Sequence, residues 1–571
     1  MMMIRSGLAL GGVFLTAVMV HAQSLPPEMT AKIDKTFEKW NRPDSPGCAL
    51  GVYQNGQIVY EHGYGMANLN DDVPITPATV FHVASMSKQF TAAAILLLAQ
   101  EGKLSLDDDV HKYIPELPDL GERITLRHLM HHTSGIRDQW ALLGLAGWRY
   151  SQDLITDDDV MSVLVHQKAL NFKPGEKFLY SNTGFTLLAQ VVKRVSGLSL
   201  REYTTKNIFE PLNMKHTHFR DDHEEVIKHD AFGYEQDGED KPYRMSLTNF
   251  DTTGATSLHT TVEDLQLWDE DFYHPRVGGP EFVKQMLQPG RLNNGKEQDY
   301  ASGLSIGTYK GLPTVGHGGA DAGYRSDIVR FPEQHFTATA LCNRADANPG
   351  SLTRQVAEIV LANQIKQPAA PSIKEPAKST GLVELTAEQM NSVAGTYWKR
   401  DDDDYQRIVL KDGALQMDFG GNEYHALKPL VESHFQVMNV PWSKDMDLHF
   451  VAAGEGKPAR IEQSWDGGDA EVYEWVQAVE PTPAQLADYG GAYMSEEIDP
   501  VYRLDIRDGQ LFLLRMKHKP DLLRPAVQDV FVGQIGTVRF TRDADHRVSG
   551  FVLDAGRIQG FLFKRQASLF P

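Results

Sequence analysis

The amino-acid sequence predicts an α/β sandwich built on an antiparallel sheet, followed by two small antiparallel β-barrels. Strand-like segments at both ends of the first part of the chain enclose a helix-rich middle; a stretch rich in Pro, Ala and Lys follows, and the rest of the sequence repeats itself. A chain of 571 residues is also too long for one hydrophobic core. We therefore expect a first domain at residues 23–365, a linker at 366–381 and barrels at 382–478 and 479–571.

The first domain begins with a predicted β-hairpin over residues 46–64, whose turn reads Gln-Asn-Gly-Gln. Residues 88–100 are apolar nearly all round, which predicts a helix that is buried on most sides and ends at Gly102. Residues 183–195 predict a second apolar helix. This middle region is therefore expected to supply the helical layer of the sandwich.

Strand-like segments return at residues 304–309, 326–331 and 336–342, before a last helix at about 352–365. These strands lie far along the chain from the first hairpin. Because an apolar sheet face must be covered, we expect both sets of strands to join one antiparallel sheet with the helices packed against it.

The sequence after the linker contains two copies of one pattern, offset by 96 residues. A constant offset over many positions indicates an internal repeat. Each copy has short alternating segments separated by turns such as Lys-Asp-Gly and Arg-Asp-Gly, which predicts a small antiparallel barrel. The matched pairs are Thr386 and Thr482, Met390 and Leu486, Gly395 and Gly491, Tyr397 and Tyr493, Asp412-Gly413 and Asp508-Gly509, Pro429 and Pro525, and Phe435 and Phe531.

Charge and the N-terminal sequence limit the partners and the location. Lys and Arg total 56 against 76 Asp and Glu, a net charge of −20, and no dense basic run is present, so nucleic acid is not expected as a partner.

Residues 1–22 contain Arg5, an uncharged stretch and Val20-His21-Ala22, which is typical of a cleaved signal peptide. We expect a periplasmic or secreted protein with no integral membrane segment after cleavage. A homodimer is left open.

The chain has two cysteines, Cys48 and Cys342, and both lie in strand-like segments that could be neighbours in one sheet. Two cysteines are too few for a disulfide scaffold. We favour two buried thiols that pack as small apolar side chains over a disulfide, and expect neither to be catalytic.

Three short motifs predict a nucleophilic site. Ser85 stands three residues before Lys88 at the start of the first apolar helix, so both side chains project from one helix face and the amine can take the proton of the hydroxyl. The helix dipole favours negative charge at this end. The ordinary lysine pKa of about 10.4 must be lowered by burial before Lys88 can act as a base.

The second and third motifs are Tyr180-Ser181-Asn182 and His317-Gly318-Gly319. The Tyr180 phenol can share a proton with Lys88 and Ser85 and pass it to the leaving group. The glycines allow a strand edge to approach an extended substrate without a Cβ in the way. His317 is expected to point into the cleft, where it adjusts the proton chain or binds a carboxylate.

These motifs, together with residues 129–135 and 254–265, resemble those of the penicillin-recognising serine hydrolases over about residues 28–365. Within this group, the motifs look most like those of the class C β-lactamase and D-aminopeptidase branch of serine peptidases. It implies a β-lactamase/transpeptidase-like fold and an acyl-enzyme on Ser85. The roles it implies are proton transfer for Lys88 and Tyr180, binding of the substrate amide for Asn182, substrate contact for Gly319, and an oxyanion hole from the N–H groups of Ser85 and Ala320.

The third motif departs from the β-lactamases, which carry Lys-Thr-Gly where this chain carries His317-Gly318-Gly319. The family lysine engages the acidic group of penicillins and D-Ala-D-Ala peptides, whereas His-x-Gly is similar to D-aminopeptidases and related esterases. The resemblance to D-aminopeptidases also implies that the two barrels are lipocalin-like and that a loop of the last barrel reaches the active site. Residues 496–500 and 516–520 are the candidates for that loop.

We therefore expect an exported serine hydrolase that cleaves amide bonds of small peptides in the manner of a D-aminopeptidase, without a cofactor. An esterase, a D-Ala-D-Ala carboxypeptidase or a weak β-lactamase on the same site is the alternative, and a non-catalytic binding protein is the second.

Other polar clusters are expected to be structural. His131 and His132 belong to a turn motif, and a solvated loop is favoured over a zinc site for a histidine-rich stretch. Residues 401–404 form an acidic run that we expect at a hairpin tip, unless it faces the cleft and attracts an amino group. The histidines of the loop are His216, His218 and His223.

Overall fold

The computed structural model describes most of the chain from residue 24 to residue 567. The described ranges are 24–238, 241–365, 385–400, 404–420, 423–431, 433–438, 440, 446–454, 459–465 and 470–567. The predicted signal peptide, the predicted linker and the first three residues of the acidic run lie outside the described residues. The domain boundaries based on them stay predictions.

One six-stranded sheet forms the centre of the first domain, with neighbours in the order β10-β11-β12-β13-β1-β2 and antiparallel pairing throughout. The first hairpin joins the late strands through β1 and β13, as expected from the sequence. The strands are β1 (Cys48–Gln54), β2 (Gln57–Tyr64), β10 (Ser305–Tyr309), β11 (Leu312–Asp321), β12 (Tyr324–Phe331) and β13 (Phe336–Cys342).

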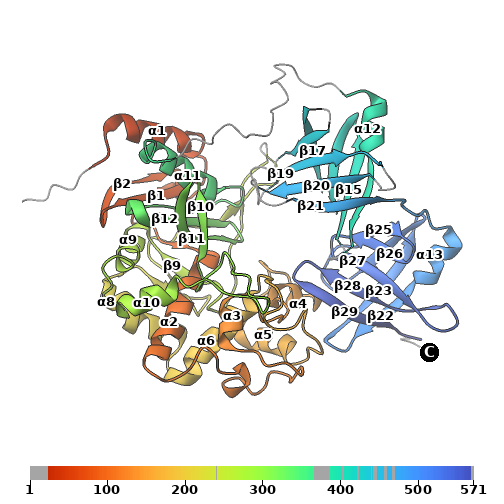
Figure 1. Cartoon of the computed structure of the whole chain (residues 1–571), viewed down its shortest axis with the longest axis horizontal. Helices are drawn as coiled ribbons and strands as arrows, with labels where there is room; N and C mark the ends of the chain where they lie inside the picture. The colour runs from red at the N-terminus through yellow and green to blue at the C-terminus, as the bar shows by residue number, and fades with distance from the viewer. Residues whose placement is uncertain are drawn as a thin grey trace, which may run out of the picture.

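Helices cover both faces of this sheet (Figure 1). On one face α1 (Pro27–Phe37) and α11 (Pro349–Val360) share a hydrophobic cluster with strand residues. The helical layer on the other face contains α2 (Lys88–Gln100) and α6 (Asn182–Ser196). The other helices are α3 (Leu126–Met130), α4 (Gln139–Leu145), α5 (Asp157–Leu164), α7 (Leu200–Thr204), α8 (Glu210–Leu212), α9 (Val262–Asp271) and α10 (Gly279–Met286). The predicted α/β sandwich is confirmed.

Helix α2 occupies the predicted residues 88–100 and is buried along almost its whole length. It packs against α6, which begins directly after Tyr180-Ser181 and ends where Gly197 adopts a left-handed conformation with φ 75°. Short strands complete the helical side: β3 (Met66–Asn68), β4 (Val73–Pro74), β5 (Phe81–His82), β6 (His218–Phe219), β7 (Tyr234–Glu235), β8 (Arg244–Met245) and β9 (Leu258–Thr260).

Cys48 and Cys342 form a disulfide, so the expectation of two free thiols is wrong. The reason is the register of the central strands: β1 and β13 run antiparallel and place these two residues directly opposite each other. Composition alone favoured two buried thiols, because it carries no information on cross-strand register. The disulfide links β1 and β13, which are the first and the last strand of this sheet along the chain.

Removing this disulfide is expected to lower the free energy of unfolding by about 2–5 kcal/mol. The bond joins residues 294 apart in sequence, so its loss releases a long segment of the unfolded chain. The double variant Cys48→Ala/Cys342→Ala and the wild type are compared by urea unfolding, with and without reductant. Reductant should lower the wild type to the level of the variant; a wild type that is insensitive to reductant and no more stable than the variant would contradict this.

Two closed eight-stranded antiparallel barrels follow, as predicted. The first comprises α12 (Ala387–Val393), β14 (Gly395–Lys399), β15 (Asp404–Lys411), β16 (Ala414–Gly420), β17 (Glu423–Val431), β18 (His434–Val437), β19 (Met446–Val451), β20 (Arg460–Trp465) and β21 (Glu471–Val476). The second comprises α13 (Pro483–Tyr489), β22 (Gly491–Ser495), β23 (Ile498–Arg507), β24 (Gln510–Leu514), β25 (Asp521–Val527), β26 (Val530–Gly533), β27 (Gly536–Arg542), β28 (Val548–Ala555) and β29 (Ile558–Arg565).

The repeated residues perform the same structural task in each barrel. Thr386 and Thr482 each cap the short helix of their barrel in a capping box with a glutamine three residues later. Pro429 and Pro525 each lie at an irregularity in strand pairing, where a missing N–H costs little. The sequence repeat therefore reflects a repeat of structure.

The second barrel packs against the first domain, whereas the first barrel has a hydrophobic cluster of its own. Residues of the second barrel belong to the same buried cluster as α2 and α6, and the Tyr502 hydroxyl donates to the Leu145 carbonyl at 2.8 Å. Figure 1 shows both barrels on one side of the first domain, with β22–β29 beside α4 and α5.

In the part of the chain that the structure describes, no helix combines the length and the apolar character needed to cross a membrane.

Candidate active site

Ser85 lies in a short 3-10 turn (Ala84–Ser87) that leads directly into α2, and Lys88 is the first residue of that helix. Their spacing brings the Lys88 Nζ to 3.0 Å from the Ser85 Oγ, as predicted. Ala84 has a φ of 49°, a left-handed conformation that costs energy for a residue with a Cβ. The chain is thus held in a sharp turn immediately before the serine.

Lys88 is completely buried and bound on three sides. Besides Ser85, its Nζ donates to the Asn182 Oδ1 at 2.9 Å and to the Ala255 carbonyl at 2.7 Å. Burial, and then the positive charge of Arg557, lower the pKa of the Lys88 amine well below its ordinary value, against the opposing effect of nearby carboxylates. The amine is therefore suited to accept a proton.

Asn182 begins α6 and is fully engaged within the protein. Its Oδ1 accepts from Lys88, while its Nδ2 and its backbone N donate to the Asp138 Oδ2 at 2.9 and 2.7 Å. These contacts let Asn182 orient Lys88, and the expected binding of a substrate amide stays a prediction. Asp138, which also caps α4, was not predicted, although it lies only three residues beyond the motif at 129–135.

Tyr180 lies two residues before α6 and lines the cleft together with Ser85. The Lys88 Nζ lies 5.0 Å from the centre of its ring, and the ring of His132 packs on it at 4.2 Å. Burial raises the pKa of the Tyr180 phenol above its ordinary value, so the phenol keeps its proton at neutral pH. Lys88 and Tyr180 are thus shifted in opposite senses, the pattern of a base and an acid.

His317 lies on β11 and both of its ring nitrogens are engaged. Its Nδ1 is 2.5 Å from the Gly318 carbonyl oxygen. Because a carbonyl oxygen can only accept a hydrogen bond, Nδ1 carries the proton, and Nε2 accepts a hydrogen bond from the Tyr300 hydroxyl at 3.0 Å. Burial and the nearby Lys88 lower the pKa of His317 to about 4. A neutral imidazole with both nitrogens occupied favours a role in the proton network over binding of a carboxylate.

The strand segment 317–321 has a free edge. Strand β10 pairs with β11 only as far as Gly316, whereas β12 pairs with β11 up to Asp321. A Cβ at Gly319 would lie 2.3 Å from the Val83 carbonyl oxygen, so only glycine lets β11 pack this closely against the segment before Ser85. Gly319 and Ala320 therefore lie beside the serine, as expected from the sequence.

A second unpredicted carboxylate, Asp321, joins these two segments. It accepts from the Tyr150 hydroxyl at 2.9 Å and the Thr256 hydroxyl at 2.8 Å, and lies 3.0 Å from the His82 Nε2. His82 lies three residues before Ser85, and Asp321 follows Ala320. The two sides of the predicted oxyanion hole are thus tied together by buried groups.

All seven predicted site residues converge on one cleft of about 650 Å³, since Lys88 contacts Ser85 and the other six line its wall. The cleft lies between the helical layer and the free edge of β11. Its further lining includes Trp140, Tyr150, Thr256, Asp321, Arg325, Ser326, Asp327, Asn348 and Arg557.

Of the described residues of the second barrel, Arg557 alone lines this cleft. It lies in the turn between β28 and β29, whereas the loops suggested from the sequence contact the first domain elsewhere. Glu497 pairs with Arg137, and Lys517 lies 3.5 Å from Asp153. The prediction that a loop of the last barrel reaches the site holds, but both candidate segments were wrong.

A comparison with known families now identifies the chain. The family model described as Beta-lactamase matches residues 33–362, more than half of the sequence. The chain belongs to the beta-lactamase family. Its fold and the spacing of its three motifs agree with this membership.

Curated relatives of this beta-lactamase-family chain include a penicillin-binding protein and a D-aminopeptidase. It is 31% identical over 307 residues to penicillin-binding protein 4* of Bacillus subtilis (strain 168), covering 51% of this chain and 67% of that protein. It is 26% identical over 454 residues to D-aminopeptidase of Gluconobacter oxydans (strain 621H), covering 80% of each. The chain covers 62% of protein flp from Staphylococcus aureus (strain N315), less than two thirds of that protein.

Among solved structures, the chain is similar to the octameric penicillin-binding protein homologue from Pyrococcus abyssi. The TM-score is 0.54 at 23% identity, and the match covers 78% of this chain and 99% of the other. At this identity the likeness supports the beta-lactamase-family fold alone.

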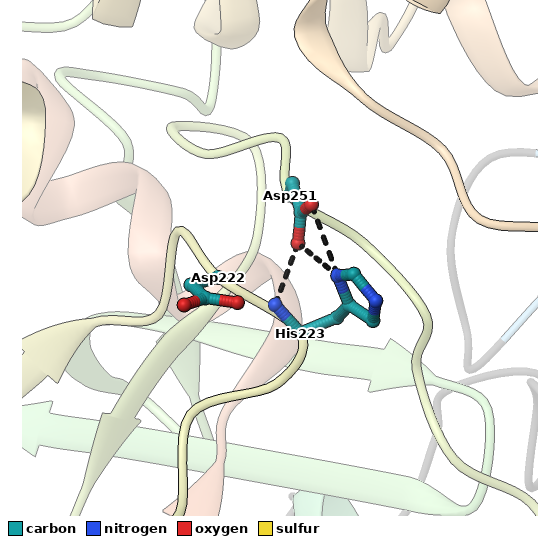
Figure 2. Close-up of side chains that lie close together, drawn as sticks. All are labelled: Asp222, His223 and Asp251. Carbon is teal, nitrogen blue, oxygen red and sulfur yellow. Dashed lines mark hydrogen bonds and ion pairs between the residues drawn. The ribbon is translucent and has the colours of Figure 1, made fainter.

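The histidine-rich loop of this family member holds an ion pair rather than an evident metal centre. Of the described residues, Asp222, His223 and Asp251 bring three potential ligand atoms within 4.8 Å of one another. Figure 2 shows the His223 ring turned toward Asp251, whose carboxylate oxygens both lie 3.0 Å from its Nδ1. His216 and His218 belong to other contacts, and we assign no metal site here.

Proposed function

We propose that the protein is a serine hydrolase that forms an acyl-enzyme on Ser85. The observation that carries this proposal is the buried Lys88 amine, 3.0 Å from the Ser85 hydroxyl, with a lowered pKa. Lys88 takes the Ser85 proton while Oγ attacks the carbonyl carbon of the substrate. The N–H groups of Ser85 and Ala320 stabilise the oxyanion.

Collapse of the tetrahedral intermediate breaks the bond to the leaving group. Tyr180 donates its proton to the leaving nitrogen and regains one from Lys88, and water then hydrolyses the acyl-Ser85 ester with the same groups acting in reverse. Asn182 and Asp138 hold Lys88 in place, and His317, which is fixed by Tyr300, lies beside the Tyr180 ring.

Small peptides are the substrates that we propose, cleaved in the manner of a D-aminopeptidase. A D-aminopeptidase is similar to this chain over 80% of both lengths, including part of the barrel region. The cleft contains side chains of both charge signs, which suits a zwitterionic peptide. The second barrel closes one side of the cleft, which suits a short substrate.

An ester, a D-Ala-D-Ala peptide or a penicillin is the second candidate class, because the same acyl-enzyme chemistry serves all of them. The relative named penicillin-binding protein 4* favours this alternative. The absence of a Lys-Thr-Gly motif argues against an efficient β-lactamase.

Export to the periplasm or the medium is also proposed. The disulfide supports it, because such bonds persist in oxidising compartments. The N-terminal signal and the homodimer remain predictions, tested by sequencing the mature N-terminus and by light scattering of the purified protein.

One preparation tested with D-alanine p-nitroanilide, a short-chain p-nitrophenyl ester and nitrocefin separates these classes. The proposal predicts that the anilide is turned over with a higher kcat/KM than nitrocefin, and that Ser85→Ala abolishes all activity. A fluorophosphonate should label the wild type and not Ser85→Ala. Activity or labelling that survives in Ser85→Ala would exclude this mechanism, and no labelling at all would favour a binding protein.

The pH profile of acylation should reflect the lowered pKa of Lys88. Because Lys88 acts as a base, the rate rises as its amine loses a proton, and the midpoint of that rise should lie well below the ordinary value of 10.5. The measurement is the rate of fluorophosphonate labelling against pH. A rate that rises only near pH 10 would show that the amine is charged at neutral pH.

A further inference from the structure

The turn between β28 and β29 is anchored firmly against the first domain. The Asn171 Nδ2 donates to the Arg557 carbonyl at 3.0 Å, and the Asn171 Oδ1 accepts from the Gln559 backbone N at 2.8 Å. The buried Arg137 donates to the carbonyls of Gln559 and Gly560 at 3.1 and 3.3 Å. The Arg557 carbonyl and the residues that follow it are thus held against the first domain, and the turn presents the Arg557 side chain to the cleft.

The Arg557 guanidinium lies over a ring of the site but has spare hydrogen-bonding capacity. Its carbon is 4.7 Å from the centre of the Tyr180 ring, and its side chain is 45% exposed. Its nearest recorded acidic atom is the Asp138 Oδ2 at 3.7 Å, which is too far for a hydrogen bond and already accepts twice from Asn182. Among the described residues, no acceptor is recorded within hydrogen-bond distance of the guanidinium.

The two carboxylates that line the cleft are engaged within the protein. Asp321 accepts from Tyr150 and Thr256 and pairs with His82. The Oδ2 of Asp327 accepts from Thr353 and Arg354. The Nη1 of Arg325 donates to two carbonyls of its own turn. Of the two arginines that line the cleft, Arg557 is the one that lies over the Tyr180 ring.

The position of Arg557 beside Tyr180 indicates which part of a substrate it meets. In the proposed reaction Tyr180 protonates the leaving nitrogen, so the leaving group departs past the Tyr180 ring. When the leaving group is an α-amino acid, its carboxylate carbon is two bonds from that nitrogen. A guanidinium that lies over the same ring is within reach of that carboxylate and can bind it through two parallel N–H donors.

We infer that Arg557 is a specificity-determining residue that binds the carboxylate of the leaving amino acid. The site therefore selects dipeptides with a free C-terminus over neutral amides. The neutral His317 cannot supply this charge, whereas Arg557 of the second barrel carries it beside the Tyr180 ring. This inference rests on the proposed function, because that function defines the side of the cleft from which the leaving group departs.

The test compares D-alanyl-glycine with D-alanyl-glycinamide, two ligands that differ in the terminal charge. Release of D-alanine is measured for the wild type, Arg557→Ala and Arg557→Lys. Arg503→Ala, an exposed arginine of the same barrel that pairs with Asp505, is the control. We expect Arg557→Ala to lower kcat/KM for the acid by about 10- to 100-fold and for the amide by less than about threefold. Arg557→Lys should lie between, and Arg503→Ala should match the wild type.

Binding is measured separately from turnover. In a Ser85→Ala background, calorimetry should show that D-alanyl-glycine binds about 10- to 100-fold more tightly than its amide, and that Arg557→Ala removes this difference. Equal affinities for the two ligands with Arg557 present would overturn the inference. An equal loss of kcat/KM for both substrates in Arg557→Ala would also overturn it, because Arg557 would then act only by lowering the pKa of Lys88. Discrimination in binding without turnover by the wild type would instead contradict the proposed function alone.

Discussion

Replacing Lys88 with methionine is expected to slow the acylation of Ser85 by about 100- to 10,000-fold. Methionine fills much of the same buried space but cannot accept the Ser85 proton. The rate of fluorophosphonate labelling measures this directly, because it does not depend on knowing the natural substrate. The pH-dependent rise of the rate that we ascribe to Lys88 should also disappear.

Folding has to be monitored in this variant, because the Asn182 Oδ1 and the Ala255 carbonyl lose their donor. Urea unfolding of Lys88→Met serves that purpose, and the exposed Lys103 provides a matched Lys103→Met control that should react like the wild type. A folded Lys88→Met protein that is labelled at the wild-type rate would show that another group deprotonates Ser85.

Replacing Glu497 with alanine is expected to destabilise the contact between the second barrel and the first domain by about 3–5 kcal/mol. Glu497 and Arg137 form an ion pair across this contact, with side chains only 7% and 1% exposed. Removing the carboxylate leaves the Arg137 charge buried without its partner, and the Lys168 backbone N loses its acceptor. Denaturant unfolding and hydrogen exchange in the β28–β29 turn should both report the change.

The neighbouring Glu496 provides the control, because it pairs with Lys564 at the surface. Glu496→Ala should leave the free energy of unfolding close to that of the wild type, because an exposed ion pair contributes little. Equal effects of the two substitutions would mean that the buried pair does not hold the barrel in place.

Local sequence patterns predicted most of the fold. The apolar run at residues 88–100 predicted both ends of α2 correctly, because a helix that is buried on most sides is recognisable from its own uniform apolar character. The 96-residue offset predicted two equivalent barrels, and the repeated threonines and prolines form the same helix cap and the same irregularity of strand pairing in each barrel. Cross-strand register was beyond such patterns, which is why the Cys48–Cys342 bond was missed.

The site was predictable where its residues lie in short motifs and not where the tertiary fold supplies them. Ser85 and Lys88 face each other because helix geometry fixes their spacing. Asp138 and Asp321 act on the site from neighbouring elements, and only the second lies next to a predicted residue. Arg557 lies in an Asp-Ala-Gly-Arg turn that resembles any hairpin turn, and only the docking of the barrel gives it a role.

The mass of the adduct on Ser85 tests the central claim most directly. The protein is incubated briefly with a set of peptides that contain D-residues, quenched in acid, and analysed by intact and peptide-level mass spectrometry. We predict an increase equal to the acyl part of the substrate, located on Ser85 and absent from Ser85→Ala. Turnover of a peptide with no acyl adduct on Ser85 under rapid quench, or an adduct on another residue, would contradict the acyl-enzyme mechanism.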